Sequence, residues 1–410
     1  MAVEYGLLIA TLAGVVFMHR WALAFAAAGW VSMTVWKLAF GSFAGQSGPG
    51  GLLVHLGHEW LMLANLAGLL LGFAVLARHF ELSRVPERMP RWLPDGWTGG
   101  LALLGAVLVL SSFLDNIAAV MIGGIVARQV YGGRVHLGFL AAMVAAGNAG
   151  GAGSVIGDTT TTMLWIGGVS PLQVAPAALG AIASFAVFAP IAARVQHRHQ
   201  PIAADEAPGL AIDWTRLAIV AVVLAAALVT NVAFDFPAAG VWGAILVAGL
   251  VRPIPWDEVK KAMHGALCLT PIVATAGMLS VEKLPAASAA TTFALGLLSA
   301  VFDNIPLTKL ALAQGGYDWG LLAFAIGYGG SLTWFGSSAG VALAEEYPEV
   351  QDTRAWLRHG WPVALGYLVG FAVMLAALGW APPGSQPVRP TEASVAAPAV
   401  PAMPGGVLRP

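Results

Sequence analysis

Charged residues are scarce in this chain of 410 residues. Lys, Arg, Asp and Glu make up only 10% of it and hydrophobic residues 58%, and the mean hydropathy is +0.77. A soluble domain carries about 25% charged residues, so the composition predicts an all-α polytopic membrane protein. The sequence has no basic patch of the kind that binds nucleic acid. We therefore expect the lipid bilayer, and no nucleic acid, as a partner.

Cysteine is almost absent as well. Cys268 is the single cysteine and lies in an apolar run, which excludes an internal disulfide and disfavours a metal site built from thiolates. A basic segment before the first apolar stretch is also missing, because Glu4 precedes that stretch. We expect no cleaved signal peptide, so the first span should remain in the mature chain.

Apolar stretches near the length that a bilayer requires, about 20 residues, recur along the chain. They fall near residues 5–18, 21–40, 56–77, 172–193, 214–231, 238–251, 263–281 and 359–380. Two shorter apolar arms, 97–112 and 117–127, flank Asp115 and Asn116, and this pattern predicts a re-entrant hairpin with its tip near residue 115. A second hairpin tip is predicted near residue 303, at Asp303 and Asn304.

Two glycine-rich polar segments, 147–162 and 327–340, interrupt apolar helices. The first contains Asp158 and a row of threonines, and the second contains several serines. Glycine weakens a helix and exposes its backbone, and exposed backbone at membrane depth is tolerated only where it lines a cavity or is buried in protein. Broken helices of this kind form the ion and substrate sites of secondary transporters. The alternative is a glycine-rich packing segment without a ligand.

The second half of the chain repeats the order of the first. Gly329, Gly330 and Gly336 have the spacing of Gly150, Gly151 and Gly157, so Asp158 corresponds to Ser337 and Thr159 to Ser338. Most of the 20 basic residues lie in loops on one side of this arrangement, and positive charge marks the cytoplasmic side. We therefore expect two inverted-topology repeats, 1–194 and 214–380, in a cell's inner membrane. Between them we expect a cytoplasmic linker, 195–213, and after them an outer, disordered tail, 381–410.

Polar residues at the tips and breaks are candidate ligands for a cation. A carboxylate at mid-membrane is costly unless it is paired, hydrated or protonated, so such a residue is functional by default. Burial raises the pKa of a carboxyl group and a bound cation lowers it, so one group can exchange a proton for a cation. Hard cations take oxygen ligands, and we expect Asp115 and Asp158 to bind the transported Na⁺. The full candidate set is Asp115, Asn116, Asn148, Asp158, Thr159, Thr160, Asp303, Asn304, Ser331, Ser337 and Ser338.

These residues also have structural interpretations. Asp115 could cap the return arm of its hairpin, and Asp158 could lie in a solvated loop. The serines of the second break could serve close packing of helices.

Four other charged or titratable residues are open to two interpretations. Lys309 could extend to the outer membrane interface or act as the counter-ion of Asp303. His55, His58 and Glu59 are spaced like metal ligands, but their position at a membrane edge favours a structural or mild pH-sensing role.

The motifs resemble those of one family of transporters. They are Asp115-Asn116, residues 148–151 with 156–165, residues 303–307, and residues 329–331 with 336–340. Together they look like NhaD-type sodium/proton antiporters, within the ion transporter superfamily that also holds arsenite and dicarboxylate or citrate carriers. The resemblance implies Na⁺ or Li⁺ export driven by inward proton movement, and a homodimer. It implies ion-site positions at Asp115, Asn116, Asn148, Asp158, Thr160, Ser331, Ser337 and Ser338. Gly153, Ser154 and Lys309 depart from the pattern.

The main alternative is a proton- or sodium-coupled carrier of an anion or metalloid, such as a dicarboxylate, citrate or arsenite. Carboxylate carriers of the superfamily tend to have neutral tips of Ser, Asn and Thr, so acidic tips favour a cation. The isolated Cys268 disfavours a soft metalloid. We expect no enzyme activity, because no nucleophile with a base accompanies Asp115 or Asp158. We expect no cofactor either, only the transported Na⁺ or Li⁺ and H⁺.

Overall fold

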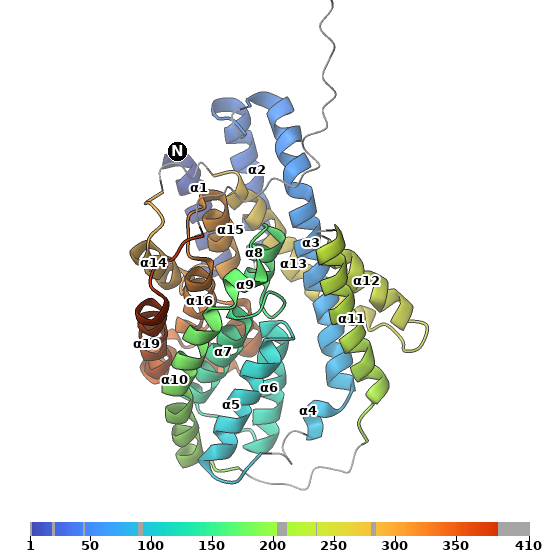
Figure 1. Ribbon diagram of the computed structural model, residues 1–410, viewed down its shortest axis with the longest axis vertical. Helices are drawn as coiled ribbons and strands as arrows, with labels where there is room; N and C mark the ends of the chain where they lie inside the picture. Colours follow the sequence, from blue (N-terminus) through green and yellow to red (C-terminus); the bar gives the residue numbers. More distant parts are fainter. Residues whose placement is uncertain are drawn as a thin grey trace, which may run out of the picture.

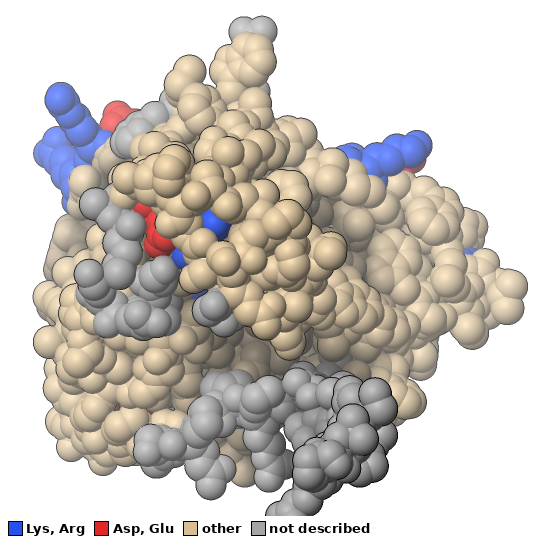
Figure 2. Space-filling view, turned by 90° about the horizontal axis from the view of Figure 1, so that it is seen from above, with Lys and Arg blue, Asp and Glu red and all other residues tan. Residues whose placement is uncertain are grey.

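The computed structural model describes residues 2–18, 21–43, 46–88, 93–202, 211–234, 236–279 and 284–383. Residues 203–210 of the predicted linker and the predicted disordered tail from residue 384 on lie outside this part. Within these ranges, five helical segments are long and apolar enough to cross a membrane: Ala22–Phe40, Gly48–Leu82, Pro171–His199, Trp214–Asn231 and Trp361–Leu378. The face shown in Figure 2 is mostly uncharged, with charged side chains in a few small groups. At this level the predicted all-α polytopic architecture is confirmed.

Six helices form what we call the peripheral group. They are α1 (Ala2–Phe17), α2 (Ala22–Phe40), α3 (Gly48–Leu82), α11 (Trp214–Phe234), α12 (Pro237–Ala248) and α13 (Trp256–Gly277). The long helix α3 contacts α11, α12 and α13, and α13 also contacts α2; α3, α11 and α12 lie along one side of the molecule (Figure 1). Two glycines of α3 allow the close approach of α12, because Gly72 faces Val241 and the carbonyl of Gly68 accepts a hydrogen bond from Trp242 at 2.9 Å.

The remaining helices form the central group. They are α5 (Trp97–Ser111), α6 (Asn116–Val130), α7 (Leu137–Ala152), α8 (Thr159–Ile166), α9 (Pro171–Val174), α10 (Ala177–His199), α14 (Ala289–Ser299), α15 (Asn304–Gln314), α16 (Trp319–Gly329), α17 (Ser338–Glu346), α18 (Thr353–His359) and α19 (Trp361–Leu378). Three short segments lie between longer helices: α4 (Val85–Arg88) between α3 and α5, η4 (Gly330–Leu332) between α16 and α17, and η5 (Pro348–Gln351) between α17 and α18. Every residue of α7 from Gly138 on is buried. A helix that is apolar all round belongs in a core, so α7 is the axis of this group.

Helices end and begin at the positions where the sequence predicts tips and breaks. One hairpin joins α5 to α6 with Asp115 at the N-cap position of α6, and another joins α14 to α15 with Asp303 at the N-cap of α15. The first break separates α7 from α8, whose N-cap residue is Asp158. The second separates α16 and η4 from α17, whose N-cap residue is Ser337.

The two hairpins make matching contacts with the two broken helices. The Ser111 hydroxyl donates to the carbonyl of Gly147 at 2.5 Å, and the Ser299 hydroxyl donates to the carbonyl of Ile326 at 2.8 Å. A Cβ added to Gly150 would collide with the carbonyl of Leu108, and one added to Gly329 would collide with the carbonyl of Gly296. Only glycine permits these backbone approaches.

Some helices run beyond their predicted apolar stretches, and ion pairs three residues apart lie in two of these extensions. Helix α3 runs from Gly48 to Leu82 rather than over 56–77, and Arg78 pairs with Glu81 at 2.7 Å in its last turns. Helix α13 begins at Trp256 rather than 263, with Lys260 paired to Asp257 at 3.2 Å. Such pairs three residues apart support a helix without apolar burial.

Candidate ion-binding site

The first break is held open by threonine side chains. Between α7 and α8 the backbone loses helical hydrogen bonds, and buried carbonyls need other donors. The Thr161 hydroxyl donates to the carbonyls of Ser154 at 2.6 Å and Asp158 at 2.9 Å, and the Thr162 hydroxyl donates to that of Val155 at 2.9 Å. These two threonines were not among the predicted site residues, although the row of four threonines was the signal for such a role.

A chain of amide hydrogen bonds connects the first hairpin tip with both breaks. Asn116 Nδ2 donates to Asn148 Oδ1 at 2.9 Å and to Asp158 Oδ1 at 3.1 Å. Asn148 Nδ2 donates to the hydroxyls of Ser331 at 2.9 Å and Ser337 at 3.0 Å. All five side chains are buried. The structure therefore brings residues from both halves of the chain into one network around Asn148.

Among the described residues, two carboxylate oxygens at this network have no donor in good hydrogen-bond geometry. They are Asp115 Oδ1 and Asp158 Oδ2, and both residues are buried, with 8% and 1% of their surface exposed. Asp115 occupies the N-cap position of α6, and its carboxylate interacts favourably with the backbone amides of Asn116 and Ile117, so the capping interpretation accounts for part of its environment. The two carboxylates are close enough to repel each other electrostatically. A buried anionic oxygen without a partner is costly, and a cation or a proton would remove that cost.

The threonines that follow Asp158 line the same place. The Thr159 hydroxyl lies 3.4 Å from Asp158 Oδ1, in position to donate a hydrogen bond. Thr160 is 1% exposed, and its hydroxyl and backbone amide interact favourably with the Asp158 carboxylate. Both can add neutral oxygen ligands beside the carboxylate.

The second hairpin tip is already satisfied by hydrogen bonds. Asp303 Oδ1 accepts from the amide of Ile305 at 3.0 Å, and Oδ2 accepts from the hydroxyl of Ser338 at 3.1 Å. Asn304 is buried beside it. Asp303 interacts electrostatically with Asp158, so this tip lies near the network, but it leaves no carboxylate oxygen without a partner.

Lys309 does not act as the counter-ion of Asp303, and that interpretation is wrong. Its Nζ pairs with Glu59 Oε2 at 2.7 Å. Nor does it extend to the outer interface, because only 6% of its surface is exposed. Sequence reasoning missed this partner, which lies on another helix far away in the chain. Within the described residues no cluster of three His, Cys, Asp or Glu side chains could hold a metal, so His55, His58 and Glu59 do not form one.

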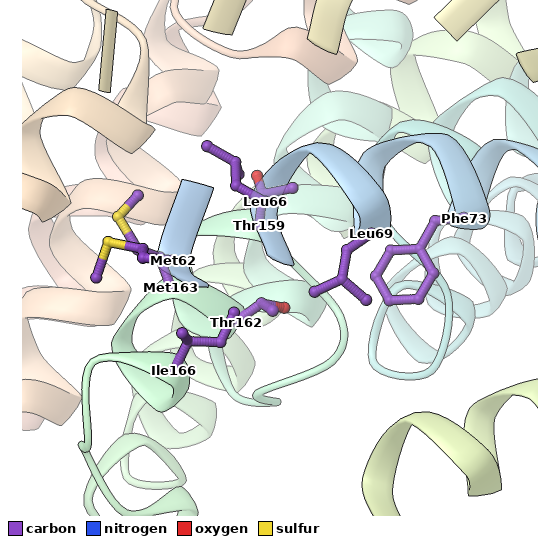
Figure 3. A pocket seen from close by; sticks show the side chains of 8 residues that line it. All are labelled: Met62, Leu66, Leu69, Phe73, Thr159, Thr162, Met163 and Ile166. Carbon is purple, nitrogen blue, oxygen red and sulfur yellow. The ribbon is translucent and has the colours of Figure 1, made fainter. Parts of the chain in front are cut away.

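A narrow apolar cavity lies beside the site, between the two helix groups. Figure 3 shows Met62, Leu66, Leu69 and Phe73 of α3 opposite Thr159, Thr162, Met163 and Ile166 of α8. Thr159 therefore has one side toward Asp158 and the other toward this cavity. The cavity has no charged lining residue and offers nothing that would hold an anion.

Helices interrupted around buried polar groups, in a chain with several membrane-crossing helices, define a multi-pass membrane transporter. Comparison with known proteins agrees with this class. The chain belongs to the citrate transporter (CitMHS) family, whose model matches residues 5–329. The predicted place in the ion transporter superfamily is thereby confirmed.

One curated relative is described as the Na(+)/H(+) antiporter NhaD of Halomonas elongata. It is 35% identical to this chain over 85 residues, which are 20% of this chain and 17% of the relative. The match thus spans less than a fifth of that protein. The sodium/proton antiport in its name is therefore stated of the relative and not of this chain.

Proposed function

We propose that this transporter exchanges Na⁺ or Li⁺ for H⁺ across the cell's inner membrane by alternating access. The observation that carries the proposal is the pair of buried carboxylates, Asp115 and Asp158, each of which has one oxygen without a donor in good hydrogen-bond geometry among the described residues. The charge of Asp158 also acts on Asp115. None of the ion pairs between described residues includes Asp115, Asp158 or Asp303. The missing positive charge is therefore supplied from outside the chain, by a cation or a proton.

The same oxygens account for exchange rather than co-transport. A protonated carboxyl group is a poor cation ligand, and a bound cation disfavours protonation, so the two ions compete. Asn116 holds Asp158 in place through Oδ1 and leaves Oδ2 free for the transported ion. Thr159, Thr160 and the Ser331 and Ser337 hydroxyls would complete the oxygen set. Asp303, Asn304 and Ser338 would border this set of oxygen ligands on the side of the second hairpin tip.

The two halves, 1–194 and 214–380, would act as inverted-topology repeats. The matching hydroxyl and glycine contacts of the two hairpins support this arrangement. Helices α5 and α6 occupy the lower part of Figure 1, and α14 and α15 the upper part. Each hairpin would then be re-entrant from its own side of the membrane. The linker would be cytoplasmic and the tail outside, and the homodimer rests on the resemblance to NhaD-type proteins alone.

A sodium-coupled citrate or dicarboxylate carrier is the second candidate, and the family description favours it. Citrate carries several negative charges and needs basic side chains or a bound cation to enter a buried site. The basic residues on the return arms of the hairpins, Lys309 and Arg128, are already paired with Glu59 and Glu346. Two unpaired carboxylates would repel the anion, so the geometry favours the cation alone.

A flux assay distinguishes the two candidates. Purified protein in proteoliposomes with a preformed pH gradient should release that gradient when Na⁺ or Li⁺ is added, and not when K⁺, citrate or arsenite is added alone. A matched control is Asp352→Asn, which changes an exposed cap residue of α18. A response that requires citrate would replace the antiport proposal with the carboxylate carrier.

A further inference from the structure

Lys309 and Glu59 form a partly buried ion pair between the two helix groups, with 8% and 18% of their side chains exposed. Glu59 lies on α3 of the peripheral group, and Lys309 lies on α15 of the central group. The Nζ of Lys309 is 2.7 Å from Glu59 Oε2 and 3.2 Å from the sulfur of Met62. Of the nine ion pairs between described residues, this one joins the two groups.

The surroundings of the pair are tightly packed. A Cβ added to Gly277, at the end of α13, would lie 3.0 Å from Lys309 Cε and 3.4 Å from Glu59 Oε2. Beside the pair, a small apolar cluster joins Leu66, Met163, Val273 and Ile305, which come from α3, α8, α13 and α15. The pair thus lies beside an apolar cluster, with His55 close enough to interact with both charges, and removal of one charge leaves the other without its closest partner in a partly buried place.

The helix that carries Lys309 also carries the second hairpin tip. Asp303 is the N-cap residue of α15 and Asn304 its first residue, and Asp303 accepts the hydrogen bond of Ser338 from the second break. A shift of α15 against α3 would move this tip relative to Asp158, whose charge interacts with that of Asp303. The position of α15 therefore affects the electrostatics of the ion site without any contact of Lys309 with the ion.

We infer that Glu59 and Lys309 are positioning residues that fix α15, and with it the Asp303–Asn304 tip, at the distance from Asp158 that cation binding requires. This inference rests on the proposed cation exchange for its flux readout. The ion pair sets the apparent affinity for Na⁺, whereas Asp115 and Asp158 supply the ligands. The position of α15 depends on the attraction between opposite charges at positions 59 and 309, and not on which of the two positions carries the lysine.

The test uses four variants of the full-length protein in proteoliposomes. Lys309→Met and Glu59→Gln each remove one charge, Glu59→Gln with Lys309→Met removes both, and Glu59→Lys with Lys309→Glu reverses the pair. The matched control is Glu4→Gln with Lys37→Met, because Glu4 and Lys37 form a buried pair at 3.0 Å within the peripheral group, between α1 and α2. The readouts are the half-saturating Na⁺ concentration and amide hydrogen exchange in residues 304–314.

We expect each single variant to raise the half-saturating Na⁺ concentration by about fivefold or more, within the usual range of coupling between sites. The same variants should exchange faster in residues 304–314, and the reversed pair should restore both readouts, whereas the control should change neither. The doubly neutral variant leaves no unpaired charge and should fold even if a single variant does not, with weakened Na⁺ affinity and faster exchange.

Two results would overturn the inference. One is a doubly neutral variant with the wild-type half-saturating concentration and wild-type exchange, which would make the pair merely structural. The other is a reversed pair that folds but stays impaired, which would mean that Lys309 acts by its own identity. If the wild type shows no Na⁺ or Li⁺ flux, the proposed function fails, and hydrogen exchange in residues 304–314 alone decides the inference.

Discussion

Replacement of Asp158 by asparagine tests the proposed site most directly. Asparagine has nearly the same shape, and its Oδ1 can still accept the hydrogen bonds that Asp158 takes from Asn116 at 3.1 Å and Thr159 at 3.4 Å. The change therefore leaves the network in place. It removes one negative charge, and it replaces the unpartnered Oδ2 with an amide that donates hydrogen bonds instead of binding a cation.

The size of the effect follows from the loss of one charged ligand. Interactions with a charged group contribute about 1.5–3 kcal/mol, and each 1.4 kcal/mol corresponds to about tenfold in affinity. The half-saturating Na⁺ concentration should therefore rise by about 10- to 150-fold. Proton-coupled flux at the half-saturating Na⁺ concentration of the wild type should fall close to background, because the amide binds Na⁺ weakly and leaves Asp115 as the remaining carboxyl group that can exchange a proton. Thermal stability should not fall, since the repulsion between Asp158 and Asp115 is removed.

The assay is Na⁺-driven release of a pH gradient in proteoliposomes, together with a thermal melt of the same preparation. Asp352→Asn is the control, because the exposed Asp352 only caps α18 and asparagine is an equally good cap. If Asp158→Asn exchanges Na⁺ at the wild-type half-saturating concentration, Asp158 is not a coupling residue and the proposed site is wrong.

Three further predictions concern competition, stability and orientation. The half-saturating Na⁺ concentration of the wild type should fall as pH rises and then level off, because protons and Na⁺ compete for the same carboxylates; a constant value between about pH 6 and 9 would require separate sites. Burial, and then the nearby His359 and His199, lower the pKa of His136, so the unfolded chain binds this proton more readily and stability decreases below about pH 6.5. His136→Asn, which keeps an N-cap on α7, should therefore melt with less pH dependence between pH 7.5 and 5.5 than the control His197→Asn, and equal slopes would contradict this cause. In a Cys268→Ser background, an impermeant thiol reagent on intact cells should label a cysteine at Ser394 and not one at Arg88, and the reverse pattern would refute the proposed orientation.

The sequence alone indicates where the helices break, because the physical cause of each break is local. Glycines and polar residues between apolar stretches mark the gap before Asp158 and the tip at Asp115, and the helices end at these positions in the structure. Helix lengths are less predictable. Helix α3 continues past its apolar stretch, where Arg78 and Glu81 pair along its surface, and a hydropathy pattern does not record such pairs.

Partners distant in the chain could not be predicted. The residues near Lys309 in the sequence suggest that it extends to the membrane interface or is the counter-ion of Asp303. Nothing in the sequence connects it with Glu59 on α3. The Asn148 bonds to Ser331 and Ser337 cross between the two halves in the same way. Their closeness depends on the packing of α7 against the second break, which is a property of the whole fold. Asn148 and the serines were therefore foreseen as ligands but not as one network.

The threonines in the first break have a consequence for ion selectivity. Thr161 and Thr162 satisfy the carbonyls of Ser154, Val155 and Asp158 before any ion arrives, so the backbone around the site does not depend on a ligand for its shape. In the proposed site, these bonds would limit how far the backbone can move toward a larger or smaller ion. The site would then favour a narrow range of ionic radius and disfavour K⁺ relative to Na⁺ or Li⁺.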